Sequence, residues 1–282
     1  MERGSLAAIA LATALVLAGC SWVAQPASQP TPRNDSNGSS VPKQLLSTHL
    51  HALANQSYAV RVRENTSTAS GRRNLTYLAR SNRTTERQLV RLNRAGRSKA
   101  QFLNRSVLVS RVVANGTLLL TTRPFTDGGE YAGNKSDHPV TATFDRFHRD
   151  GVAVRRLTAI YEVGAFERSG TVRRNGRTLT EYRLAHPSLN RKSNVSITHS
   201  SGRVLVDADG IVRLARIDLR GTQQDHPFVF EVEYRVTAVG TVTVSRPDWM
   251  AKAPSIGRGV TLPVDSNATR PVGNQSTTNS SG

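Results

Sequence analysis

Apolar and charged residues alternate at a period of two along most of this chain, and this pattern constrains the fold more than any other feature. The clearest stretch runs from Phe228 to Val236, where apolar residues at every second position alternate with Val229, Glu231, Glu233 and Arg235. Such alternation is typical of a strand with one buried and one wet face. Asn115-Gly116 and Asn175-Gly176 are hairpin signals between neighbouring stretches. We predict strands near residues 58–63, 74–80, 86–94, 99–103, 107–114, 118–123, 164–174, 177–184, 195–200, 202–206, 212–220, 227–239 and 241–245.

Three segments have helical spacing instead. The pattern predicts a helix over Val41–Asn55, and two short helices over Val140–Arg149 and Val152–Tyr161 that are separated at Asp150-Gly151. A short helical turn follows Arg246-Pro247. The order of elements predicts a mainly β (α+β) fold, with one large curved antiparallel sheet, a half-barrel, and a few helices packed on its concave face.

Composition divides the chain into four parts. Residues 1–19 have the short charged start and apolar run of a signal peptide. Residues 20–41 and 254–282 are polar, lack a hydrophobic period and are predicted to be a disordered tether and a disordered tail. Residues 42–253 then form the folded domain.

The apolar run ends in Leu17-Ala18-Gly19-Cys20, which holds the only cysteine of the chain. This ending resembles the lipobox of bacterial and archaeal lipoproteins. The resemblance implies cleavage before Cys20, lipidation of Cys20 and attachment to the outer face of the cell membrane. The alternative is an uncleaved membrane anchor over Leu6–Ala24, because a span needs about 20 residues. Both alternatives place the rest of the chain outside the cytoplasm.

Asparagine is concentrated in glycosylation sequons. Of 16 Asn residues, 13 are followed at the second position by Ser or Thr. Sequons on exposed segments of a secreted protein are acceptors for N-glycans. We therefore expect a glycosylated surface, with these candidate acceptors: Asn34, Asn37, Asn65, Asn74, Asn82, Asn115, Asn134, Asn194, Asn267 and Asn274.

Four features together are similar to haloarchaeal surface lipoproteins with a LolA/LprG-type half-barrel. They are the lipobox, the hairpin Asp207–Arg213, the strand Val232–Val236 and the ending Arg246-Pro247-Asp248-Trp249. The chain departs from that group in being basic. The resemblance implies a hydrophobic cavity between sheet and helices, whereas the same side chains could also close into a dry core. The expected lining is Tyr58, Val60, Val62, Phe144, Phe147, Tyr161, Phe228, Phe230 and Tyr234.

Motifs for catalysis or metal binding are absent from the sequence. Asp207-Ala208-Asp209-Gly210 lacks the later ligands of a calcium loop and is interpreted as a turn. None of the seven histidines forms a metal-binding motif, and no G-x-S-x-G or phosphate-binding glycine loop occurs. We expect no enzyme activity and no cofactor, although residues that are distant in the sequence could still form a catalytic site.

Charge supplies the alternative function. The chain has 38 Lys and Arg against 20 Asp and Glu, a net charge of +18. Such a surface attracts anionic partners, and outside the cell these are acidic envelope polymers, S-layer proteins or anionic lipid headgroups. Nucleic acid is not expected, because the stacking aromatics of a single-strand platform are missing. The arginines could equally be the wet face of a sheet. The sequence thus predicts a non-catalytic surface lipoprotein that binds a lipid or other apolar ligand, or else an arginine-rich interaction module. It does not indicate the oligomeric state.

Overall fold

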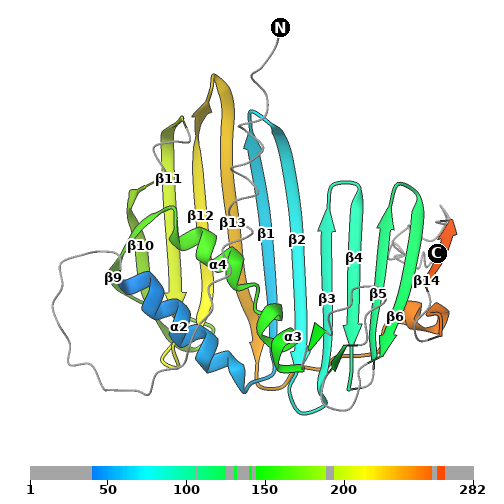
Figure 1. The fold of residues 1–282 in the computed structure, drawn as a ribbon. Coiled ribbons are helices and arrows are strands. Elements are labelled where there is room, and N and C mark those ends of the chain that lie inside the picture. The colour runs from blue at the N-terminus through cyan, green and yellow to red at the C-terminus, as the bar shows by residue number, and fades with distance from the viewer. Residues whose placement is uncertain are drawn as a thin grey trace, which may run out of the picture. The chain divides into compact units, whose positions relative to one another are not determined.

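Within the residues that the structure describes, the period-two segments form a single antiparallel sheet of twelve strands (Figure 1). The computed structural model describes residues 40–105, 107–124, 130–131, 140–141, 144–188, 194–255 and 259–263. In chain order the sheet strands are β1 (Tyr58–Thr68), β2 (Gly71–Asn82), β3 (Arg87–Arg94), β4 (Arg97–Leu103), β5 (Val107–Ala114), β6 (Thr117–Pro124), β9 (Gly164–Arg174), β10 (Arg177–Pro187), β11 (Val195–Val206), β12 (Val212–Gln223), β13 (His226–Val239) and β14 (Gly259–Pro263).

Two meanders meet in the middle of this sheet. The spatial order is β14-β6-β5-β4-β3-β2-β1-β13-β12-β11-β10-β9, so β1 pairs with β13 although the two strands are far apart in the sequence. Within each meander, hairpins join sequential strands. Asn115 and Gly116 have φ values of 50° and 71°, and Asn175 and Gly176 have 51° and 76°, as tight hairpin turns require. The prediction of a mainly β fold with one large antiparallel sheet is confirmed.

Of the helices in the part of the chain that the structure describes, three pack on one face of the sheet, which we call the helix-side face. They are α2 (Ser40–Ala54), α3 (Phe144–Gly151) and α4 (Val154–Tyr161). Helix α4 contacts β9, β12 and β13, whereas α3 contacts β2 and β3. The main core cluster joins side chains from α2, α4 and the sheet. The predicted pair of helices between the two meanders is confirmed, but the first begins at Phe144, because Val140–Thr141 (β8) pairs with Glu130–Tyr131 (β7) in a separate two-stranded ladder.

Two predicted strands are in fact one. Residues 195–200 and 202–206 belong to the continuous strand β11, with Gly202 in its middle. A Cβ on Gly202 would come within 2.8 Å of Leu184 and 3.0 Å of Ile217. This glycine therefore permits close packing on the helix-side face and does not interrupt the strand.

The strand predicted over Thr241–Ser245 is absent, and the alternating pattern there has another cause. Val242 and Val244 are buried in a small cluster with Ala59 and Met250, on the face of the sheet opposite the helices, which we call the outer face. This segment leads to the short helix η2 (Asp248–Lys252), which agrees with the predicted helical turn. Strand β14, which pairs with β6, was not anticipated.

Candidate functional site

The expected lining residues lie between the helices and the sheet, and most of them are fully packed. Side chains of the main core cluster are less than 9% exposed, and they include Tyr58, Val60, Val62, Tyr161, Phe228 and Tyr234. Phe230 is half-buried against this cluster. Phe144 and Phe147 lie apart from it and pack on Leu103 and Leu108. The structure thus brings seven of the nine residues into one cluster and two into a second.

Helix α2 is fixed to the sheet through a buried histidine. The backbone N–H of Val212 donates to Nδ1 of His49 (3.1 Å), so Nε2 carries the proton and donates to the hydroxyl of Tyr234 (2.9 Å). Burial lowers the pKa of His49 to about 4, and Arg213 contributes in the same direction, partly offset by Asp207. His49 is therefore a neutral structural group at ordinary pH.

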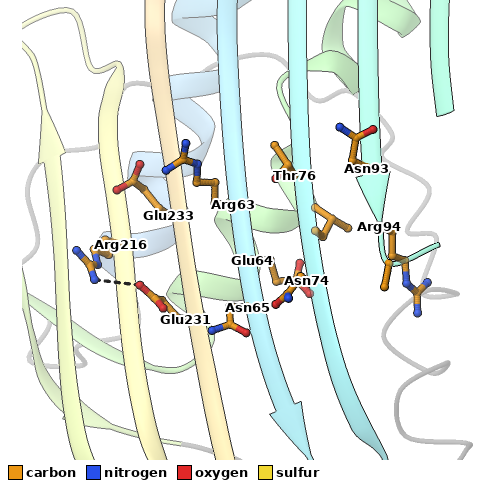
Figure 2. A pocket seen from close by; sticks show the side chains of 12 residues that line it. Arg63, Glu64, Asn65, Asn74, Thr76, Asn93, Arg94, Arg216, Glu231 and Glu233 are labelled. Carbon is orange, nitrogen blue, oxygen red and sulfur yellow. Dashed lines mark hydrogen bonds and ion pairs between the residues drawn. The ribbon is translucent and has the colours of Figure 1, made fainter. Parts of the chain in front are cut away.

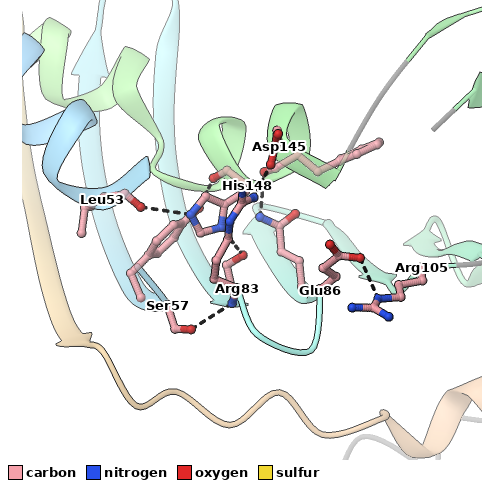
Figure 3. Close-up of polar contacts among 11 residues, drawn as sticks. Leu53, Ser57, Arg83, Glu86, Arg105, Asp145 and His148 are labelled. Carbon is pink, nitrogen blue, oxygen red and sulfur yellow. Dashed lines mark hydrogen bonds and ion pairs between the residues drawn. The ribbon is translucent and has the colours of Figure 1, made fainter. Parts of the chain in front are cut away.

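Helix α3 is fixed by polar side chains of the sheet and by its own histidine (Figure 3). Gln88 donates to the carbonyl of Phe147 (2.7 Å), and the Tyr58 hydroxyl donates to the carbonyl of His148. The ring of His148 bridges Ser81 (2.7 Å) and the carbonyl of Leu53 (3.0 Å). Burial lowers the pKa of His148. These bonds satisfy carbonyls at the end of α3, which would otherwise be buried without partners.

Helix α4 is fixed by an ion pair under its first turn. Glu64 on β1 is 6% exposed and binds both Arg73 of β2 (2.5 Å) and Arg156 of α4. Burial lowers the pKa of Arg156, and Glu64 opposes this effect. One buried carboxylate thus fixes the position of the helix.

Beyond the helices, the helix-side face continues across the sheet and becomes exposed. Strand register places Tyr234, Val62, Tyr77, Leu92, Lys99, Val112 and Leu119 in one row across seven adjacent strands. Tyr234 and Val62 are fully buried, Leu92 and Val112 are half-buried, and Leu119 is 39% exposed. We call these seven residues the apolar row. It leads from the closed core to an open apolar surface.

Cations dominate the strands that carry the open end of this row. Three basic residues lie on β2, three on β3, two on β4 and one each on β5 and β6, and these five strands contain no Asp or Glu. We call β2–β6 the acid-free half. Burial and the neighbouring Arg97 and Arg123 lower the pKa of Lys99. An anion beside Lys99 would relieve this unfavourable environment.

The second meander differs from the acid-free half in carrying acidic residues beside its basic ones. Strands β9–β13 also carry ten Lys and Arg residues, but they carry five acidic residues as well. The acids Glu181, Asp218, Glu231 and Glu233 each bind at least one arginine. We call β9–β13 the paired half.

The turn at Asp207 agrees with its interpretation from the sequence. Its Oδ1 accepts the N–H groups of Asp209 and Ile211, and its Oδ2 binds Arg213 at 2.5 Å. Among the residues that the structure describes, no three His, Cys, Asp or Glu side chains cluster in a way that could hold a metal ion. In the same part of the chain, none of the helices is both long and apolar enough to cross a membrane.

Five candidate glycan acceptors fall within the described residues. Asn115 is exposed at a hairpin turn, Asn194 is exposed just before β11, and Asn65 and Asn74 face each other across β1 and β2. Asn82 donates its amide hydrogen to the carbonyl of Val242 (2.7 Å) and accepts the N–H of Thr85 (2.8 Å), so its amide already has partners. Outside the described residues lie Cys20, Asn34, Asn37, Asn134, Asn267 and Asn274.

Comparison with known proteins gives a family and a set of similar folds. The model of a family of unknown function, DUF7537, matches residues 5–253. No curated protein matches the chain. The crystal structure of LprF from Mycobacterium bovis is 12% identical with a TM-score of 0.29, and the alignment covers 74% of this chain and 96% of that one. A LolA superfamily protein from Nitrosomonas europaea is 9% identical with a TM-score of 0.22, covering 74% and 96%. MucB, in its complex with MucA from Pseudomonas aeruginosa, is among the further similar structures, at 12% identity and a TM-score of 0.26 over 76% and 62%.

Proposed function

This chain belongs to the DUF7537 family, whose function is unknown, and we propose that its domain binds an anionic lipid without catalysing a reaction. The acyl chains lie along the apolar row, and the headgroup contacts Lys99 and the neighbouring Arg97 and Arg123. The observation that carries the proposal is the row itself, which begins under the helices and emerges among cations.

The exposed end of the row supplies the apolar contact. Leu92, Val112 and Leu119 are half-buried or exposed. Complete burial of a Leu or Val side chain contributes about 1.5–3 kcal/mol. Three such residues, each gaining part of that amount, are sufficient for reversible binding of an acyl chain, and the buried members Val62 and Tyr234 form the closed end.

The cations supply selectivity for a negative headgroup. Arg97, Lys99 and Arg123 lie on β4 and β6, and neither of these two strands contains an Asp or Glu residue. Arginine binds phosphate through two parallel N–H bonds, whereas lysine acts as a point charge. The proposed ligand is therefore an anionic phospholipid and not a neutral one.

In this proposal the lining residues expected from the sequence have two roles, as the packed interior and as the edge of the open surface. Tyr58, Val60, Phe228 and their neighbours form the packed interior on which the helices rest. Phe144 and Phe147 lie next to Leu103 and Leu108, at the edge of the open surface. A ligand that entered between the helices and the sheet would contact the remaining members of the set.

The lipobox-like ending at Cys20 supports a lipid anchor on the extracytoplasmic face of the membrane. Cys20→Ser is expected to abolish lipidation and to yield either a released protein or an uncleaved precursor, measured by intact mass and by cell fractionation. A lipidated Cys20→Ser protein would contradict the anchor, but it would leave the lipid-binding site untouched.

A pair of matched leucine substitutions tests the lipid site. Leu119 is 39% exposed on the helix-side face, and Leu78 is 37% exposed on the outer face. Leu119→Asp is expected to weaken binding of fluorescent phosphatidylglycerol more than tenfold, because it places a carboxylate in the apolar row, while Leu78→Asp leaves that binding unchanged. Phosphatidylcholine should bind more weakly than phosphatidylglycerol, and Lys99→Gln should reduce this preference.

Two results would overturn the proposal. One is equal loss of binding in Leu119→Asp and Leu78→Asp, with both proteins folded by circular dichroism. The other is a lipid-free protein in native mass spectrometry after incubation with phosphatidylglycerol vesicles.

A further inference from the structure

The outer face carries a second feature, a polar groove of about 630 Å³ that crosses β12, β13, β1, β2 and β3. Figure 2 shows the sheet with the helices behind it and the side chains of the groove pointing from these strands. This groove and the apolar row therefore lie on opposite faces of the sheet. The groove is therefore a separate feature that the proposed lipid site does not use.

The charges at one end of the groove are already paired. Glu231 binds Arg216 (3.0 Å), and Glu233 lies 3.4 Å from Arg235 and 3.5 Å from Arg61. Arg63 is exposed, and no ion pair joins it to an acid of the described residues. Arg94, at the far end of the lining, is likewise joined to no acid of the described residues, so the groove has two cations available to a ligand.

Amides and a hydroxyl line the other end. Asn65, Asn74, Thr76 and Asn93 come from three adjacent strands and share the outer face by register. The Oδ1 atom of Asn65 is buried and has no hydrogen-bond partner within the described part of the chain. A carboxamide offers a donor and an acceptor together, which is the pair that a sugar hydroxyl can satisfy.

Arginines continue this surface along the next row. Register places Arg61, Leu78, Arg91, Ala100 and Arg111 side by side on five adjacent strands of the outer face. The cations therefore recur at every second strand, at about 10 Å intervals, because adjacent strands are ~4.8 Å apart. Such a row matches a linear chain that carries acidic groups at regular spacing.

The geometry points to the outer face as a binding site for an acidic polysaccharide, whose hydroxyls meet the asparagines of the groove and whose acidic groups meet Arg63, Arg91 and Arg111. None of the described residues that line the groove is aromatic, so they offer no stacking platform for a single-stranded nucleic acid. The groove is also too polar for an acyl chain. Charge complementarity and the amide lining together select a polyanion that is rich in hydroxyls.

Binding to polygalacturonate and chondroitin sulfate tests this site, with uncharged dextran as the neutral probe. The double substitution Arg91→Ala, Arg111→Ala is expected to weaken polyanion binding at least tenfold. The matched control Arg173→Ala, Arg174→Ala removes the same charge from exposed positions on edge strand β9 and should leave binding within twofold. Leu78→Asp should weaken polysaccharide binding and Leu119→Asp should not, the reverse of their effects on lipid, so the two sites can fail separately.

Three outcomes would overturn this assignment. Equal losses in the two double variants would mean non-specific attraction to net charge. Equally tight binding of polyglutamate would indicate an acidic protein partner in place of a polysaccharide. A glycan attached to Asn65 or Asn74 in the protein from its native host, detected by peptide mass spectrometry, would mean that the groove is already occupied.

Discussion

The paired half and the acid-free half carry the same number of cations, but only the strands of the paired half also carry acidic residues that bind them. In the paired half, acids on neighbouring strands bind arginines across the outer face, and α4 covers the helix-side face. In the acid-free half, no strand carries an acid and the apolar row becomes exposed. The paired half therefore neutralises part of its charge with acids of its own strands, whereas the strands of the acid-free half contain no acid that could do so.

Truncating one leucine that packs on the paired half and one on the acid-free half should give the largest difference in the free energy of unfolding. Leu157 on α4 is fully buried in the main core, and Leu119 on β6 is 39% exposed. Leu157→Ala is expected to lower the free energy of unfolding by about 3 kcal/mol through lost burial and a residual cavity. Leu119→Ala should change it by less than about 0.5 kcal/mol. Urea unfolding measures both, and similar losses would show that the open end of the row is packed as tightly as the core.

Replacing a glutamate by glutamine at a buried and at an exposed ion pair compares how much each pair contributes to stability. Glu64, on the strand between β13 and β2, is buried under α4, whereas Glu86, in the β2–β3 loop, pairs with exposed Arg105 at 2.8 Å. Glu64→Gln should cost about 3 kcal/mol, because it leaves Arg73 and Arg156 without their counter-charge. Glu86→Gln should cost less than about 0.5 kcal/mol. Urea unfolding measures both free energies, and Glu64→Gln should remain the more destabilising of the two substitutions when salt is added.

Acid should weaken the attachment of α2 to the sheet. The pKa of His49 is about 4 in the folded protein, against 6.5 for an ordinary histidine, so the unfolded chain takes up a proton first. Its stabilising contribution is complete above pH 6.5 and is lost as the pH falls toward 4, by about 2 kcal/mol between pH 7 and pH 5.

A neutral replacement isolates this contribution. His49→Gln keeps a donor and an acceptor without titrating, so the fall in stability between pH 7 and pH 5 should become smaller, with the part due to His148 remaining. His226 is exposed on β13, and His226→Gln serves as the matched control that should retain the full slope. An unchanged slope in His49→Gln would assign the pH dependence to other groups.

The sequence predicted most local elements correctly, and its errors share a cause. Both helices of the middle segment and the hairpins at Asn115-Gly116 and Asn175-Gly176 were found, because spacing and turn residues are local properties. The false strand at Thr241–Ser245 has the burial pattern of a strand, but Val242 and Val244 pack across the outer face without pairing. A pattern of burial reports which side chains are covered and does not report what covers them.

The candidate site was predicted only in part. The sequence identified the apolar residues of the helix-side face, but not that Val62 and Tyr234 would be sealed while Leu92, Val112 and Leu119 stay open. The net charge and the scarcity of acidic residues between 71 and 124 are sequence properties, but which arginines bind an acid depends on the fold. The groove asparagines could have been noticed only as sequons or as single polar residues, because nothing local relates Asn93 to Asn65.

The sequence by itself determined the strands, the hairpins and the two faces of each strand, since alternation and turn chemistry act over a few residues. Only the tertiary structure decided that β1 meets β13, which strands the three helices cover, and which cations find an acid. Those outcomes depend on register between segments that are far apart in the chain, and a register is fixed only when all the strands have paired.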